Sequence, residues 1–255
     1  MRARSQGHLA RASVGRGARW TTALAVLFAA GTGDAAPTSG PVRNAHIVER
    51  MPPRPLELPN APATIGRKSE WATALEAIDV KNHNTNVRAT IRLYAEDGSV
   101  DRSALSVFMR VASSSPDHAD LPDGQIAEPL EPRLVQLAFR AAYHFGGKPV
   151  VIISATRRGA HGKHGTGEAL DFQLTGVRAA TLAAYLRTFP RAGVGIYTHP
   201  RTQFVHLDVR DRSYHWLDAS PPGVRWRDKR LSDRTQQKRD ASYSSLMDLP
   251  ETASR

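Results

Sequence analysis

Two short segments of the chain carry side chains that together suit a divalent metal ion. The first segment contains His164 and, seven residues later, Asp171; the second contains His206 and Asp208. Two imidazoles and one carboxylate, with a fourth position left open, form a common ligand set of catalytic zinc, which activates water for hydrolysis. The chain has no cysteine and ten histidines, so any metal must be held by His, Asp or Glu.

The sequence around these residues predicts a loop and two strands that would bring them together. Glycines recur in the stretch 162–167 and loosen the backbone around His164, and an apolar strand then carries Asp171. His206 and Asp208 lie two residues apart, so they share one face of a strand while their apolar neighbours face the core. Residues 193–197 predict a further strand, joined to this one by a polar turn.

The remaining patterns predict an α+β domain over residues 69–220. Strands are expected at 87–94 and 149–154, and helices at 134–145 and 179–189. Because strands and helices do not alternate regularly, these patterns favour an α+β domain over a doubly wound sheet.

Residues 1–35 have the features of a secretory signal peptide. Five arginines and no acid precede an apolar run at 20–30, which small residues follow as far as Ala35 and Ala36. The run is shorter than the roughly 20 residues that span a bilayer. We therefore expect cleavage after Ala35 and export to the cell envelope or periplasm without stable membrane insertion; an uncleaved membrane anchor is the alternative.

The charge and the two ends of the mature chain have a simple interpretation. Residues 1–35 contain five Arg and one Asp, so their removal lowers the formal net charge from +11 to +7. This value suits adhesion to an anionic polymer such as peptidoglycan, or general solubility, and the scattered basic residues do not predict nucleic-acid binding. Residues 36–68 predict a proline-rich linker, and residues 221–255 predict a basic, disordered tail because they contain few large apolar side chains.

The order of the motifs resembles the D-Ala-D-Ala metallopeptidase superfamily and, within it, the YcbK-like murein endopeptidases. The first motif is His164-Gly-Thr-Gly-Glu-Ala-Leu-Asp171; Ser154-Ala-Thr-Arg157 precedes it, and Gly193-Val-Gly-Ile-Tyr197 and Phe204-Val-His206-Leu-Asp208 follow. The likeness covers about residues 80–212. It implies a single compact domain in which helices flank a small central antiparallel sheet. It also implies Zn²⁺ as cofactor and peptidoglycan peptides as substrate.

The same resemblance assigns roles to five residues. His164, Asp171 and His206 take the positions of the metal ligands. Asp208 would orient the attacking water or accept its proton, and Arg157 would hold a substrate carboxylate or stabilise a developing oxyanion. Other branches of the superfamily place a Glu or His just upstream of the last ligand, whereas this chain has Gln-Phe-Val at 203–205. Glu168 is the substitute that remains for the base.

Several alternatives stay open at the level of sequence. His161 competes with His164 as a ligand. For Asp208 the alternative role is to orient the ring of His206, and for Arg157 it is that of a structural ion-pair partner. A non-catalytic peptidoglycan-binding or scaffold protein with the same fold is the main rival function. An iron oxygenase is disfavoured because its ligand set needs a later His, and His215 follows Asp208 too closely. The oligomeric state is not predicted.

Overall fold

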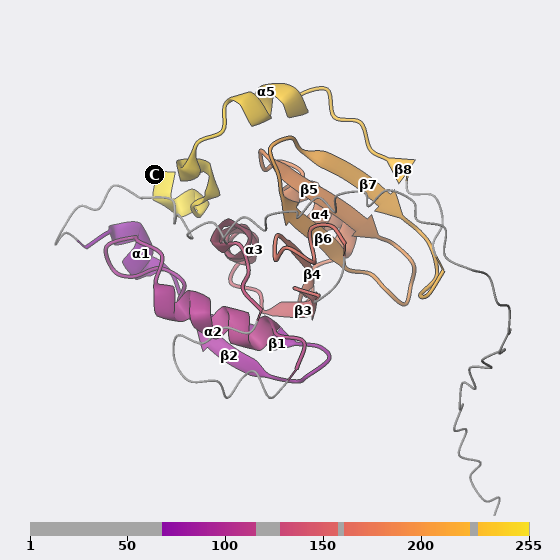
Figure 1. Ribbon diagram of the computed structural model, residues 1–255. Coiled ribbons are helices and arrows are strands. Elements are labelled where there is room, and N and C mark those ends of the chain that lie inside the picture. The colour runs from indigo at the N-terminus through magenta and orange to yellow at the C-terminus, as the bar shows by residue number, and fades with distance from the viewer. Residues whose placement is uncertain (1–67, 116–127, 158–160, 225–228, 255) are drawn as a thin grey trace, which may run out of the picture. The chain divides into compact units, whose positions relative to one another are not determined.

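The computed structural model describes residues 68–115, 128–157, 161–224 and 229–254. The predicted signal peptide and nearly all of the predicted linker lie outside these residues. Along the chain the elements are α1 (Glu70–Ala74), β1 (Ile78–Asn82), β2 (Arg88–Ile91), α2 (Arg102–Ala112), α3 (Pro132–His144), β3 (Val150–Ser154), β4 (Ala169–Leu174), α4 (Ala179–Leu186), β5 (Ala192–Tyr197), β6 (Val205–Val209), β7 (Tyr214–Asp218), β8 (Lys229–Arg230), α5 (Gln236–Ala241), η2 (Ser245–Asp248) and η3 (Glu251–Ser254) (Figure 1).

Eight strands form one mixed sheet in the order β2-β1-β3-β4-β6-β5-β7-β8. The four central strands, β3-β4-β6-β5, are antiparallel, whereas β1 pairs with β3 and β5 pairs with β7 in parallel. The α+β class is confirmed, but the sheet is larger than the small antiparallel one expected. Because β6 is already paired with β4 and β5, β7 pairs with the free edge of β5. The two strands are parallel.

One face of the central strands packs against α3 and α4. Leu170, Phe172, Val194 and Leu207 on this face are completely buried and share one apolar core with both helices. Burying each such side chain stabilises the fold by about 1.5–3 kcal/mol. Because side chains alternate along a strand, the residues between them point to the opposite face. That opposite face carries the candidate site.

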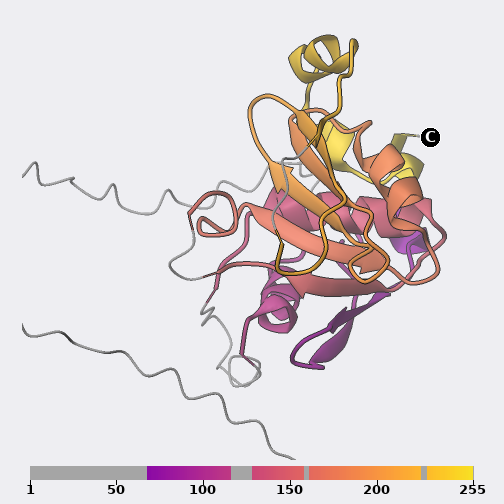
Figure 2. The ribbon, with the colours of Figure 1, turned by 90° about the vertical axis from the view of Figure 1, so that its right-hand side faces the viewer.

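The predicted disordered tail is wrong for residues 229–254. After β8 the chain forms α5, η2 and η3 and passes beside α3, as the yellow segment in Figures 1 and 2 shows. The prediction failed because it counted apolar side chains, whereas buried polar pairs hold this segment. Asp248 is fully buried and accepts hydrogen bonds from Arg133 at 2.9 and 3.1 Å and from Tyr243 at 2.7 Å.

Two further acids attach the same segment to the domain. Asp240 accepts hydrogen bonds from the backbone N–H groups of Arg191 and Ser213 at 2.6 and 2.8 Å, and from the Ser213 hydroxyl at 2.6 Å. Glu251 accepts one from the Tyr185 hydroxyl at 2.9 Å. The tail therefore fixes the start of β5, which begins directly after Arg191.

His215 lies inside the domain. It is completely buried on β7, and the Arg187 side chain lies 3.4 Å from its Nδ1 atom. Burial, together with the Arg187 and Arg239 charges, lowers the pKa of His215 to about 4, so the ring is neutral at pH 7. Among the described residues, no helix has the length and apolar character that crossing a membrane requires.

Candidate metal centre

One row of directly paired residues crosses the sheet and supplies two of the three proposed ligands. Asp171 on β4 lies opposite His206 on β6, and His206 lies opposite Gly195 on β5. Directly paired residues point to the same side of a sheet. The carboxylate of Asp171 and the imidazole of His206 therefore meet on the face away from α3 and α4. Trp216 on β7 continues the row beyond Gly195.

His164 reaches this row from the loop that precedes β4. Its backbone carbonyl accepts a hydrogen bond from the N–H of Arg157 at 2.9 Å, and its ring Nδ1–H donates to the carbonyl of Ala155 at 2.7 Å. This second bond keeps the proton on Nδ1 and leaves the Nε2 lone pair free to bind a metal. The loop thus holds the imidazole in the tautomer that a ligand needs.

Gly167 in the first motif is required for steric reasons. Gly167 has a φ of +74°, and a Cβ atom on it would lie 2.3 Å from the carbonyl oxygen of Pro129. Its own carbonyl accepts a hydrogen bond from the N–H of Glu131 at 2.9 Å. Only glycine fits this approach, which seats the His164 loop against the start of α3.

The proposed ligand atoms converge on one point. Nε2 of His164, Oδ1 of Asp171 and Nδ1 of His206 lie within 4.8 Å of one another. The His164–His206, His164–Asp171 and His206–Asp171 separations are 3.3, 3.4 and 2.9 Å. Ligand atoms about 2.0–2.1 Å from a tetrahedral metal lie roughly 3.3 Å apart, so this set of two nitrogens and one oxygen fits zinc.

The centre is mostly enclosed, yet it is not sealed from solvent. The side chains of His164, Asp171 and His206 keep 13, 5 and 10% of their surface exposed. Burial alone would raise the pKa of Asp171, but the adjoining rings of His164 and His206 outweigh it and lower that pKa to about 2. Asp171 is therefore an anion across the physiological range, as a metal ligand must be.

His206 lies between two carboxylates. Burial alone would lower its pKa, but its hydrogen bonds to Asp171 and Asp208 outweigh burial and raise the pKa of His206 to about 9. Without a metal this ring holds two protons, one on each nitrogen. A metal ion at Nδ1 has to displace one of them, so metal binding releases a proton.

Asp208 lies on the edge of the His206 ring opposite to the edge that faces His164 and Asp171. His206 Nε2–H donates to its Oδ2 atom at 3.0 Å, and the guanidinium of Arg210 bonds to both of its oxygens. Burial would raise the pKa of Asp208, but the contacts with His206 and Arg210 hold it below its usual range. This position is the one from which a carboxylate orients a metal-binding histidine.

Arg157 contacts the ligand set directly. Its Nη2 group donates to Oδ2 of Asp171 at 2.9 Å, and its Nε–H donates to the hydroxyl of Ser154 at 2.7 Å. More than half of its side chain, 54%, remains exposed. The guanidinium therefore fixes the second oxygen of Asp171 and still presents a charged surface beside the centre.

The other sequence candidates lie apart from the ligand atoms. His161 is exposed and is not part of the cluster. Glu168 is held by Lys163 at 2.8 Å and by the hydroxyl of Thr166 at 2.6 Å. Sequence reasoning missed Trp216, whose ring lies 5.0 Å from that of His206. The alternate glycines at 193 and 195 were its signal, since they leave room beside β6.

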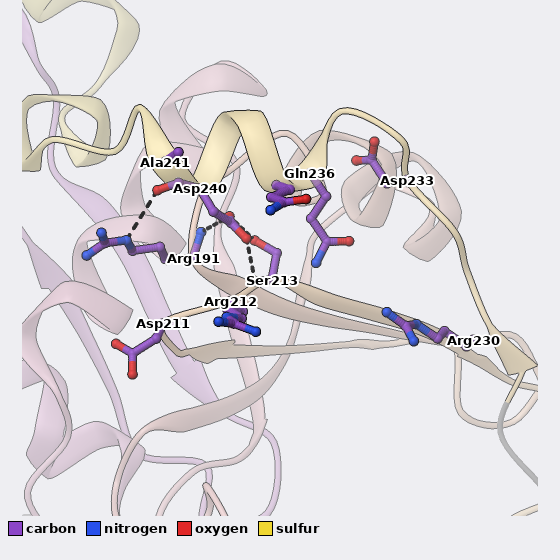
Figure 3. A pocket seen from close by; sticks show the side chains of 10 residues that line it. Arg191, Asp211, Arg212, Ser213, Arg230, Asp233, Gln236, Asp240 and Ala241 are labelled. Atoms are coloured by element: carbon purple, nitrogen blue, oxygen red, sulfur yellow. Dashed lines mark hydrogen bonds between the residues drawn. The ribbon is translucent and has the colours of Figure 1, made fainter.

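A separate polar cavity of about 530 Å³ lies between α5 and the turn that joins β6 to β7 (Figure 3). Two of the three acids that line it already have partners: Asp240 bonds to Ser213, and Asp233 pairs with Arg239. None of the three proposed metal ligands lines it. This cavity therefore belongs to the contact between the tail and the domain.

Comparison with known proteins supports the assignment of the centre. A protein-family model described as Peptidase M15 matches residues 123–208. The matched range contains all three proposed ligands and ends at Asp208. The match confirms the resemblance to the D-Ala-D-Ala metallopeptidase superfamily. It does not test the resemblance to the YcbK-like subtype. Searches of the curated proteins and of the solved structures found no match.

Proposed function

Starting from a region that matches the M15 peptidases, we propose that this protein is an exported zinc peptidase that hydrolyses bonds in the stem peptides or crosslinks of peptidoglycan. The convergence of His164, Asp171 and His206 on the face of the sheet away from α3 and α4 carries the proposal. The Peptidase M15 match supports peptide hydrolysis. The predicted signal peptide and the basic charge of the mature chain favour an anionic polymer outside the cell membrane.

Different residues of the chain have different proposed roles at such a site. Zinc at these ligands would act as a Lewis acid that polarises the scissile carbonyl and lowers the pKa of water. The two imidazoles donate hydrogen bonds to the carbonyl of Ala155 and to the carboxylate of Asp208, and these bonds hold the rings in position before substrate arrives. Arg157, half exposed beside Asp171, would bind a substrate carboxylate or the charge that develops on the carbonyl oxygen.

Asp208 is proposed to position His206 and not to act as the general base. Its oxygens are engaged by His206 and Arg210 on the far edge of the imidazole. We expect Asp208→Asn to weaken zinc affinity about 10–100-fold, the usual effect of removing such a partner. Competition with a chelating dye would measure the affinity. With saturating zinc, kcat should stay within a few-fold of the wild type, whereas a kcat that stays low would assign the base role to Asp208.

The central test is digestion of purified muropeptides by the mature protein, followed by mass spectrometry. The zinc-loaded protein should release fragments that correspond to one cleaved amide bond. Treatment with a chelator should stop the reaction, and added zinc should restore it. A zinc-loaded, folded protein that cleaves no muropeptide would contradict the proposed activity.

Binding without turnover is the second candidate, and one observation favours it. Residues 203–205 supply no acid or base, while Asp208 and Glu168 are both engaged by other side chains. Calorimetric binding of muropeptides without any cleavage product would identify the protein as a peptidoglycan-binding module with a retained metal site.

A further inference from the structure

An aromatic strip extends from the metal centre along the open face of the sheet. The rings of Trp216 and His206 lie 5.0 Å apart, and Tyr214 follows 5.8 Å beyond Trp216. Tyr214 is 36% exposed and Trp216 is partly exposed. Two neighbouring aromatic rings at the surface, in contact with a metal ligand, present a flat apolar area at the place where a substrate must lie.

The backbone makes room for the indole of Trp216. Gly195 lies between His206 and Trp216 in the same row, and a Cβ atom at this position would come within 2.5 Å of the indole carbons. The ring therefore lies directly over β5 and reaches toward His206. An alanine at 195 would displace the ring, so the glycine is what allows the strip to adjoin the centre.

Positive charge surrounds the far end of the strip. The guanidinium groups of Arg210 and Arg230 lie 5.6 and 5.3 Å from the centre of the Tyr214 ring. Arg210 is neutralised by Asp208, whereas Arg230, on β8 opposite Trp216, is exposed. Strands lie about 4.8 Å apart, so β8 is roughly 14 Å from β6, which an extended peptide spans in about four residues.

We propose that Trp216, Tyr214 and Arg230 form a substrate subsite for an acidic peptide segment. The aliphatic part of a residue near the scissile bond packs on the indole of Trp216. A carboxylate within about four residues of that bond pairs with Arg230. This inference rests on the proposed peptidase function and adds to it the side of the centre on which the peptide lies and the charge that the site selects.

The test compares two synthetic stem peptides that differ only in one carboxylate, which is free in the first and amidated in the second. For Trp216→Ala we expect KM to rise roughly tenfold for both peptides, with kcat within about threefold, because tenfold corresponds to about 1.4 kcal/mol, within what an aromatic contact contributes. Arg230→Ala should raise KM for the free carboxylate alone. Lys229→Ala, at the neighbouring exposed position, is the matched control and should leave both KM values unchanged.

A second pair of variants and an equilibrium measurement keep the test independent of folding and of turnover. Trp216→Phe should give an intermediate KM, and Gly195→Ala should reproduce the Trp216→Ala effect although the tryptophan is still present. Calorimetry with the peptides should show that the variants that raise KM also bind the peptides more weakly, while their zinc content stays that of the wild-type protein. Wild-type KM and affinity in Trp216→Ala, or an equal effect of Arg230→Ala on both peptides, would overturn the subsite.

Failure of the subsite and failure of the peptidase proposal give different results. If the wild-type protein binds the peptides without cleaving them, and Trp216→Ala lowers that affinity, the subsite holds and the peptidase proposal fails. If the wild-type protein cleaves both peptides and the four variants at Trp216, Gly195 and Arg230 all match it, the peptidase proposal holds and the subsite fails.

Discussion

The His206→Ala variant should lose peptide hydrolysis and bound zinc together. Among the described residues, His206 supplies one of three proposed ligand atoms, and it also separates the carboxylates of Asp171 and Asp208. Its removal leaves two ligands and two buried carboxylates without the group that bridges them. We expect zinc affinity to fall by more than the roughly 100-fold that loss of a supporting partner causes, and hydrolysis to become undetectable. Metal analysis after gel filtration and muropeptide digestion measure the two effects.

The same loss is expected for His164→Ala and Asp171→Ala, because each removes one ligand atom. His161→Ala is the matched control: this histidine lies three residues from His164, is exposed and is outside the cluster. It should retain zinc and activity. Full activity in any of the three ligand variants would remove that residue from the set, and loss of zinc in His161→Ala would reinstate His161 as a ligand.

Asp248→Ala should lower the free energy of unfolding by about 3–5 kcal/mol, the usual cost of breaking a buried ion pair from one side. Asp248 is completely buried, and the side chain of Arg133 is only 12% exposed. Arg133 also donates hydrogen bonds to the carbonyls of Pro190 and Arg191, so it cannot move to solvent without breaking these bonds as well. Urea denaturation followed by circular dichroism measures the loss.

Glu251→Ala is the control for this substitution. Its side chain is 47% exposed, so its contacts with His144 and Tyr185 should contribute less than about 1 kcal/mol. Equal stability of Asp248→Ala and the wild-type protein would mean that the C-terminal segment does not contribute to the folded domain in solution.

The sequence predicted the parts of the fold that local patterns determine. Alternating apolar residues located β2, β5 and β6, and a wholly apolar run located β3. Helical spacing located α3, and a helical stretch that ends before Pro190 located α4. The clustering of His164, Asp171 and His206 could be predicted because spacing places His206 on one face of a strand and because the motif containing the other two is specific. These features depend on residues close together in the chain.

Features that depend on contacts between distant segments were not predicted. The position of Asp208 is one example. Spacing places it on the same face as His206. Only the pairing of β6 with β4 decides that Asp171 contacts Nδ1 of the His206 ring and that Asp208 contacts Nε2. The docked tail is another. Its attachment through Asp248 requires a buried arginine 115 residues away, which no local pattern reveals.

The direct pairing of Asp171 with His206 makes metal capture a reporter of correct folding. Side chains alternate between the two faces, so a shift of β4 by one residue would turn Asp171 into the core and expose Leu170 and Phe172. A shift by two residues would keep Asp171 on the site face but would no longer place it opposite His206. The fraction of refolded molecules that takes up one equivalent of zinc should therefore count the molecules in which the centre of the sheet has its native alignment.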